Sequence, residues 1–210
     1  MRSLARPHPS DVLLDLGCGN GHHLLALAPE VARAIGIDIS PCMIELARAR
    51  RRSHPARANL AFEVDNAEEL RGIPDQSIDL VICIGAFEHM LDKRRVLASI
   101  YRVLKFGGRF FCLTLHADYV WYRTIAPILG VATKHLSSDR LLTQDEFSAL
   151  LDEVGFRRSR FAHWTFIPKG DMPAGVAVLL TALDAIGRHA RLEALRGGLS
   201  LCAWKEAKLT

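Results

Sequence analysis

The chain has 210 residues and a formal net charge of +4, because 27 Lys and Arg stand against 23 Asp and Glu. Half of the residues are hydrophobic and 24% are charged, a balance that supports a single buried core and excludes a disordered, collagen-like or coiled-coil chain. The five cysteines occur singly, without a CxxC pair, which argues against a disulfide scaffold or a structural zinc site.

Short apolar runs alternate with segments of helical period, as expected when parallel strands are covered by helices on both faces. Ser40 followed by Pro41 predicts the start of a helix that runs to about residue 52. Thr143 and Glu146 have the spacing of a capping box and open the clearest helix, which should end at Gly155. The strands are expected at residues 12–16, 34–39, 61–65, 78–84, 109–115, 161–167 and 199–204, and the other helices at 22–28, 92–105 (with Gly107 as its cap) and 174–195.

These elements predict one α/β domain over residues 1–210, without an internal repeat or a second domain. Residues 11–116 would form the cofactor-binding core of the sheet. Residues 117–140 would be an insertion on the substrate side, after the fifth strand. Residues 141–210 would complete the sheet and the substrate wall.

The composition also bounds the compartment and the partners. We expect a cytoplasmic protein, because the N-terminal residues include no apolar run of secretory length. The most apolar stretch, residues 174–183, is far shorter than the roughly 20 residues of a membrane span. Arginines crowd residues 48–57, but they end a predicted helix, where cations complement the helix dipole. We therefore expect no nucleic-acid partner, and a monomer or a homodimer.

A glycine-rich loop follows the first strand directly. The segment 12–21, VLLDLGCGNG, has glycines at 17, 19 and 21, and small residues there let a ligand approach the backbone closely. In an open α/β sheet a nucleotide-like cofactor lies at this turn. The dinucleotide fingerprint would need a glycine at position 22, where the chain has His22, and no P-loop Lys-Ser/Thr pair follows. The loop therefore disfavours a nicotinamide or a triphosphate.

The loop resembles that of the class I S-adenosylmethionine (SAM)-dependent methyltransferases, D/E-x-G-x-G-x-G, with Asp15 as its acid. In IGIDIS, Asp38 matches the acid that receives the two ribose hydroxyls, and EVDNAEELRGIPDQSIDLVICIGAFEHM is similar to the third and fourth strands. The segment YRVLKFGGRFFCLT is similar to the entry into the fifth strand, except that Phe106 replaces the usual proline. The resemblance covers about residues 12–156 and implies a Rossmann-like, mostly parallel sheet of seven strands with the last strand antiparallel. It also implies SAM as cofactor and S-adenosyl-L-homocysteine (SAH) as its product.

The resemblance implies a cofactor site at the carboxyl ends of the first four strands. Asp65 and Asn66 would lie beside adenine, with a plain Asx turn as the alternative; for Met43 the alternative is a core position. An acid at the end of an apolar strand, such as Asp15, needs a partner, which a ligand ammonium or loop amides would supply. The expected cofactor-binding residues are Asp15, Gly17, Cys18, Gly19, Gly21, Asp38, Ile39, Met43, Asp65, Asn66, Ala67, Ile84 and Gly85.

Methyl transfer from a sulfonium to a hydroxyl needs a base that removes the proton of the acceptor. His89, in FEHM after the fourth strand, is the first catalytic candidate, because that position faces the cleft near the methyl donor in related folds. Its alternative is to cap a helix or to line the cofactor pocket. His116, beyond the fifth strand, is the second candidate. His22 and His23 start a helix whose positive end disfavours protonation, so we expect them to shape the loop.

Glu88 and His89 also resemble part of the E-x-x-E-H metal site of some methyltransferases. The first glutamate of that set would stand at position 85, where the chain has Gly85. A carboxylate and a histidine alone make a poor site for a divalent ion. We therefore expect no required metal.

The acceptor is expected to be a small, apolar or aromatic molecule. The N/D-P-P-Y/F motif of base-amine methyltransferases is missing, since residues 84–87 read IGAF. Oxygen is the preferred acceptor atom because histidine bases serve hydroxyls best; carbon or nitrogen atoms of quinone, natural-product or lipid-like substrates stay open. Unless they belong to the core, five aromatic residues would line the mouth of the site: Tyr119, Trp121, Tyr122, Trp164 and Phe166.

Two functions of other classes stay open. A non-catalytic partner protein with this fold would be expected to lose the glycine loop or the ribose acid, and both are intact. The other alternative is an enzyme that uses SAM for chemistry other than methyl transfer.

Overall fold

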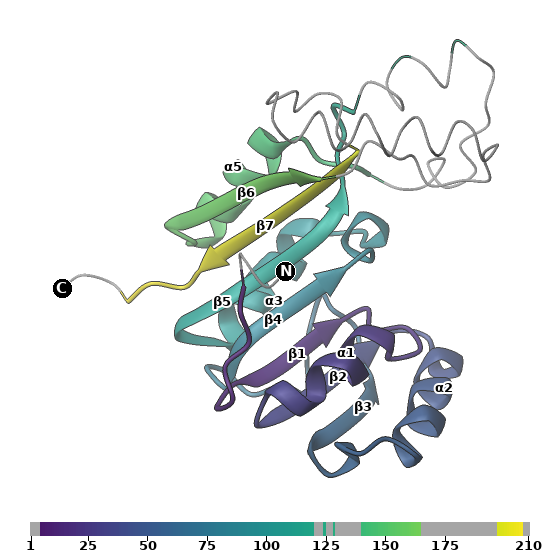
Figure 1. Ribbon diagram of the computed structural model, residues 1–210. Coiled ribbons are helices and arrows are strands. Elements are labelled where there is room, and N and C mark those ends of the chain that lie inside the picture. Colours follow the sequence, from purple (N-terminus) through teal and green to yellow (C-terminus); the bar gives the residue numbers. More distant parts are fainter. Residues whose placement is uncertain (1–4, 120–123, 125–127, 129–139, 165–196, 208–210) are drawn as a thin grey trace.

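The computed structural model describes residues 5–119, 124, 128, 140–164 and 197–207. These residues form a seven-stranded sheet with helices on both faces (Figure 1). The strand order is β3-β2-β1-β4-β5-β7-β6. The strands are β1 (Val12–Leu16), β2 (Arg33–Asp38), β3 (Leu60–Val64), β4 (Ile78–Ile84), β5 (Leu104–Leu115), β6 (Arg158–Trp164) and β7 (Gly198–Trp204).

The sheet is parallel except for β7, the last strand in the chain. β7 pairs antiparallel with both β5 and β6, whereas the pairs among β1 to β5 are all parallel. The predicted Rossmann-like fold is therefore confirmed. The strand order reverses between β1 and β4, and the crevice beyond the carboxyl ends at such a switch point is where open α/β sheets bind ligands.

Helices cover both faces of the sheet (Figure 1). Successive residues of a strand point to opposite faces, so Leu13 joins the hydrophobic cluster under α1 and α2, and Leu14 joins the cluster under α3 and α5. The helices are α1 (His22–Leu27), α2 (Pro41–Arg52), α3 (Lys93–Val103) and α5 (Gln144–Val154). The described residues also contain the 3-10 turns η1 (Ala28–Glu30), η2 (Arg57–Asn59) and η3 (Phe87–His89).

The predicted helix ends are confirmed for α2 and α5. Ser40 Oγ accepts the backbone N–H of Met43 at 3.4 Å, which satisfies one of the unpaired donors at the start of α2. At α5, Thr143 Oγ1 accepts the N–H of Glu146 at 3.1 Å, and the Glu146 carboxylate accepts the N–H of Thr143 at 2.9 Å. Gly155 ends α5 in the left-handed conformation, with φ 116°.

The boundary between α3 and β5 was predicted wrongly. α3 ends at Val103 and β5 begins at Leu104, so Gly107 is not a helix cap. Its φ of 82° instead lies within β5, where its N–H donates to the carbonyl of Lys205 at 2.7 Å. The register between β4 and β5 shifts at this point, since Ile78 pairs with Leu104 and Leu80 pairs with Arg109.

Parts of the sequence prediction lie outside the described residues. These parts are the helix at 174–195 and most of the insertion at 117–140, so the proposed division of the domain stays a prediction. In the ranges that the structure describes, no helix is long and apolar enough to cross a membrane.

Candidate functional site

The glycine-rich loop lies at the carboxyl edge of the sheet, between β1 and α1, and each glycine meets different surroundings. A Cβ on Gly17 would lie 2.5 Å from Cβ of Ala86, and one on Gly21 would lie 2.8 Å from the ring of Phe62. These two glycines therefore allow close packing within the protein. Nothing lies within 4 Å of the Cβ position of Gly19, so the backbone beside the middle glycine is open to a ligand.

Asp38 connects the end of β2 to the glycine loop. Its Oδ2 accepts the N–H of Gly19 at 2.8 Å, and its Oδ1 accepts the N–H of Ser40 at 2.9 Å. The residue is half-buried, so each oxygen keeps a lone pair for a hydroxyl group. The next side chain, Ile39, is 72% exposed and offers an apolar surface beside the carboxylate. This combination fits the ribose and adenine parts of an adenosyl group.

Asp15, the acid at the end of β1, is buried, and its Oδ2 has no hydrogen-bond partner. Burial, together with the negative charge of Asp38, raises the pKa of Asp15 to about 8. A buried carboxyl without a partner is costly once it ionises, and a cationic ligand would offset that cost. SAM carries an amino group and a sulfonium, so these two acids fit its charge as well as its shape.

Because the folded pKa of Asp15 lies above its ordinary value of 3.8, the folded cofactor-free chain binds more protons than the unfolded chain between about pH 4 and pH 8. Its stability should therefore fall as the pH rises through this window. Asp15→Asn should remove that fall, so its stability relative to the wild type should grow by on the order of a few kcal/mol between pH 5 and pH 8. Urea unfolding of both proteins at the two pH values measures this difference. A stability difference that does not change with pH would show that Asp15 ionises without cost.

Asp65 and Asn66 follow β3 in a compact turn. Asp65 Oδ1 accepts the N–H of Asn66 at 2.7 Å and its Oδ2 accepts the N–H of Gly72 at 3.2 Å, while Asn66 Oδ1 accepts the N–H of Glu68 at 3.0 Å. The alternative expected from the sequence, an Asx turn, therefore describes the local structure. It does not exclude contact with adenine, because Asp65, Asn66 and Ala67 are all only half-buried.

Cys18 and Met43 differ in what they present to a ligand. The Cys18 side chain packs in the cluster under α1 and α2, beside Gly36, and burial raises the pKa of its thiol. Only the backbone of Cys18 therefore remains for a cofactor. Met43 is 38% exposed on the first turn of α2, one turn beyond Ile39, so it is not a core residue.

The η3 turn lies directly against the glycine loop, because Gly17 faces both Ala86 and the side chain of Met90. Gly85, at the end of β4, has φ 64° and open space around its Cβ position, and Ile84 before it is half-buried. Within η3, Phe87 and Glu88 are buried whereas His89 is exposed. The turn therefore presents His89 at the edge where the glycine loop lies.

Buried polar groups that sequence reasoning missed hold the η3 turn. The ammonium of Lys93, which is 5% exposed, donates to the carbonyls of Phe87 at 3.2 Å, Glu88 at 3.1 Å and Met90 at 2.9 Å. The Glu88 carboxylate accepts from Thr114 Oγ1 at 2.9 Å. A lysine in the first turn of a helix has no sequence signature for such bonds, since a cation is disfavoured near a helix N-terminus.

The other histidines lie in different surroundings. His116 is buried at the end of β5, with Nδ1 unpartnered, Nε2 3.9 Å from a carboxylate oxygen of Asp118, and its ring 4.7 Å from that of His163. His22 and His23 are exposed at the start of α1. The His23 ring is nevertheless partly screened from solvent by the protein around it, and this partial burial, followed by the charge of His22, lowers the pKa of His23. Exposure at the cofactor edge therefore favours His89 over His116 as a group that reaches an acceptor.

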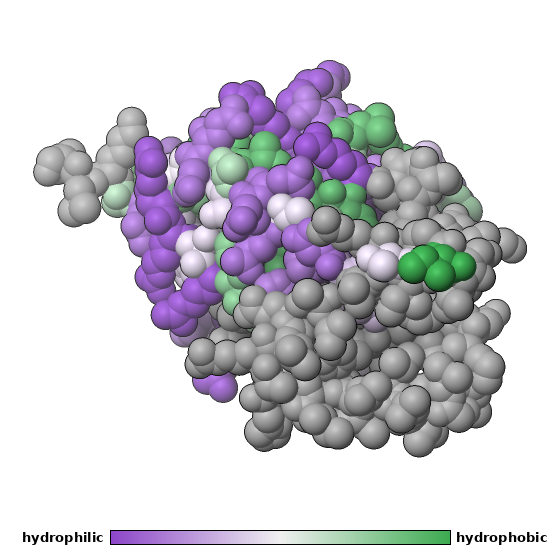
Figure 2. All heavy atoms as spheres, turned by 90° about the horizontal axis from the view of Figure 1, so that it is seen from above, coloured by the Kyte–Doolittle hydropathy of each residue, from purple (hydrophilic) through white to green (hydrophobic). Residues whose placement is uncertain are grey.

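The expected substrate wall is described only in part. The ring of Tyr119 packs over Gly197 and that of Trp164 over Gly198, so both aromatic residues lie at the start of β7. Tyr119 is buried, and Trp164 is 38% exposed. Seen from above, the described surface is mainly hydrophilic with small hydrophobic areas (Figure 2). The other predicted wall residues lie outside the described residues: Trp121, Tyr122 and Phe166.

The described ranges contain no group of three side chains arranged to bind a metal ion. The Glu88 carboxylate is engaged by Thr114, and Gly85 supplies no ligand atom. The expectation that no metal is required stays a prediction.

Comparisons with known proteins agree with this geometry. A family model described as "Methyltransferase domain" matches residues 7–151. The chain is 35% identical over 133 residues to a demethylmenaquinone methyltransferase of Symbiobacterium thermophilum. This match covers 58% of the chain and 53% of that protein. It is also 31% identical over 152 residues to the O-methyltransferase cnsE of Penicillium expansum, in a match that covers 72% of this chain and 54% of that protein. The chain thus matches about half the length of these relatives. The solved structure of the [4+2]-cyclase SpnF has a similar fold, with a TM-score of 0.72 and 19% identity over 98% of this chain and 79% of that one.

Proposed function

The chain belongs to the class I SAM-dependent methyltransferases, and on that premise we propose that it transfers a methyl group from SAM to a small aromatic or otherwise apolar acceptor, with a hydroxyl oxygen preferred. One observation carries the proposal: the turn that presents His89 packs against the glycine loop through Gly17 and Ala86. This contact supports a role for His89 as a proton acceptor beside the place where the methyl donor would lie.

Four residues would hold the cofactor. Asp38 would receive the ribose hydroxyls, Ile39 would cover the adenine ring, and the unpartnered oxygen of Asp15 would accept a hydrogen bond from the amino group. The open backbone at Gly19 would let the cofactor approach closely. When bound, SAM supplies a methyl group that is already activated on a sulfonium.

The protein's own part in the reaction is alignment and proton removal. Holding the acceptor atom about 3 Å from the methyl group is worth up to about 7–11 kcal/mol in favourable cases. His89 would take the proton of the acceptor hydroxyl. Lys93 fixes the backbone carbonyls of Glu88 and Met90 on either side of His89, which would hold the base in position for this step. A base that is held in place loses little entropy when the acceptor binds.

A phenol-like hydroxyl fits the two kinds of relative that the chain matches. Removing its proton increases the nucleophilicity of the oxygen, as an O-methyltransferase needs. The same step increases electron density on the ring carbons beside it, as methylation of a quinol ring would need. We prefer oxygen and keep carbon, in a quinone-type or natural-product ring, and nitrogen as the alternatives. His116 stays the second candidate base, but it is buried, so the residues around it would have to move before an acceptor could reach it.

SAM with a labelled methyl group tests the proposal. The chain is incubated with labelled SAM and a panel of phenols, quinols and amines, and the products are separated by mass spectrometry. Label in an acceptor supports methyl transfer and identifies the acceptor atom. SAM that binds and stays unchanged would instead indicate a non-catalytic partner protein, and label in another product would indicate other chemistry.

A further inference from the structure

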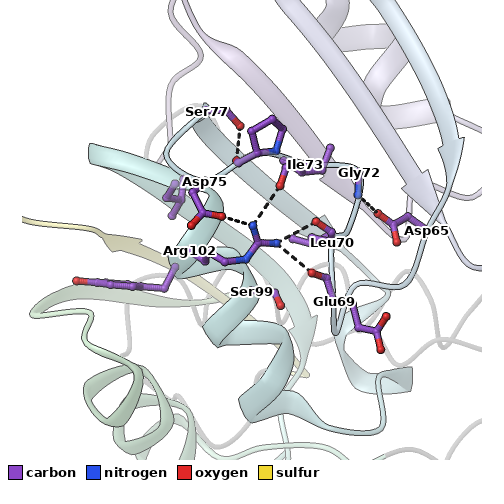
Figure 3. Close-up of polar contacts among 12 residues, drawn as sticks. Asp65, Glu69, Leu70, Gly72, Ile73, Asp75, Ser77, Ser99 and Arg102 are labelled. Atoms are coloured by element: carbon purple, nitrogen blue, oxygen red, sulfur yellow. Dashed lines mark hydrogen bonds and ion pairs between the residues drawn. The ribbon is translucent and has the colours of Figure 1, made fainter.

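Arg102, near the end of α3, reaches across to the loop that follows β3. Its Nη2 donates to the carbonyls of Glu69 at 3.0 Å and Leu70 at 2.9 Å, and its Nη1 donates to the carbonyl of Ile73 at 3.2 Å (Figure 3). Nη1 also pairs with the carboxylate of Asp75. One guanidinium thus joins four residues of a loop that has no regular secondary structure.

The same loop contains two residues in the left-handed conformation that are not glycine. Leu70 has φ 48° and Gln76 has φ 50°, a region that is unfavourable for a residue with a side chain. Both residues are bonded to Arg102: the carbonyl of Leu70 accepts from Nη2, and the N–H of Gln76 donates to the Arg102 carbonyl at 3.1 Å. The Arg102 side chain therefore stabilises Leu70 in this conformation, and the Arg102 backbone carbonyl stabilises Gln76.

Hydrogen bonds within the loop connect these residues to Asp65 and Asn66. The carbonyl of Asn66 accepts the N–H groups of Glu69 at 3.0 Å and Leu70 at 2.9 Å. Asp65 Oδ2 accepts the N–H of Gly72 at 3.2 Å, as Figure 3 shows. Two residues that bind the Arg102 guanidinium, Glu69 and Leu70, therefore also hold Asn66. Gly72, which binds Asp65, lies between Leu70 and Ile73, whose carbonyls both accept from Arg102. Asp65 and Asn66 follow β3 at the edge where the cofactor would bind.

We propose that Arg102 is a positioning residue that sets the adenine selectivity of the cofactor site through Asp65 and Asn66. The inference rests on the proposed function, since it takes these two residues to face the base. The oxygens of Asp65 suit the amino group of adenine, which donates hydrogen bonds, and not the oxo group of hypoxanthine, which accepts them. A site built for the donor rejects the analogue that lacks it.

Loss of the guanidinium should weaken both binding and selectivity. We expect Arg102→Met to bind SAH about tenfold more weakly than the wild type. Its preference for SAH over S-inosylhomocysteine, which carries hypoxanthine, should fall in parallel. Arg102→Lys should show intermediate losses, because a single ammonium cannot reach carbonyls that the two guanidinium nitrogens bind separately. A purely structural role would lower the melting temperature and leave the preference for adenine unchanged.

Asn59→Ala is the matched control. Asn59 Nδ2 also donates to two backbone carbonyls, those of Ala28 at 2.9 Å and Val31 at 3.0 Å, but it lies before β3, at the opposite edge of the sheet. Its replacement should therefore lower the melting temperature without changing the affinity for SAH or the preference for adenine.

Calorimetric titration of the wild type and the three variants with SAH and with S-inosylhomocysteine tests the proposal. Unchanged affinity and preference in Arg102→Met would overturn it. If that variant does not fold, the same unchanged result in folded Arg102→Lys overturns it equally. Absence of SAH binding by the wild type would instead count against the proposed function, so the two failures are distinguishable.

Discussion

Asp38→Ala should weaken the binding of SAH by about 1–3 kcal/mol, or roughly 5- to 150-fold, while the chain stays folded. Two effects combine in this loss. The variant lacks the charged acceptor for the ribose hydroxyls, and it also releases the N–H of Gly19, which Asp38 holds at 2.8 Å. The glycine loop would then no longer be fixed in the shape that receives the ligand. Isothermal titration calorimetry with SAH measures the change.

Asp79→Ala is a suitable control for Asp38→Ala. Asp79 Oδ2 also accepts a backbone N–H, that of Val12 at 2.9 Å, and it pairs with Lys105 at 2.8 Å. It lies near the beginning of β4, away from the carboxyl edge. Its loss should therefore lower stability but leave the affinity for SAH unchanged. If Asp38→Ala bound SAH as tightly as Asp79→Ala does, Asp38 would not be the ribose acid.

The sequence predicts strands best where the signal is local. The predicted bounds of β1 and β4 agree with the structure, because each strand is a mostly apolar run between turn signals and is buried on both faces. β6 begins at Arg158, three residues before its predicted start. Its first three residues are polar or charged, and they become a strand by pairing with Cys202 to Trp204 of β7, which are distant in the sequence.

Prediction of the site has the same limit. The glycine loop and Asp38 have a local pattern that could be found in the sequence, and the structure brings them into hydrogen-bond contact. Lys93 has no such pattern, and Arg102, although it lies in the segment YRVLKFGGRFFCLT, has no signal that indicates its contacts, since both act by donating to backbone carbonyls of segments that precede α3 in the chain. Any lysine or arginine on a helix has the same sequence signal. Only the packing of α3 against the sheet decides which of them reach a loop.

His89→Ala should lower kcat for the proposed methyl transfer by about 10²-fold or more, and the affinity for SAH should stay nearly unchanged. The turn should keep its shape, because Lys93 holds three of its backbone carbonyls and the Glu88 carboxylate is bonded to Thr114. The loss would therefore report on proton removal and not on a rearranged cofactor site. Single-turnover kinetics with labelled SAM, together with calorimetry, separate the two quantities.

His54→Ala serves as the control, because His54 lies after α2, remote from the η3 turn, and its Nδ1 accepts only a local N–H, that of Ala56 at 3.2 Å. It should keep the wild-type kcat. An acceptor that needs no proton removed, such as a neutral amine, would lose little activity in His89→Ala, so comparing a phenol with an amine isolates the role of the base. If His89→Ala lost affinity for SAH as much as it lost kcat, His89 would be a residue of the cofactor pocket. The buried His116 would then be the next histidine to replace.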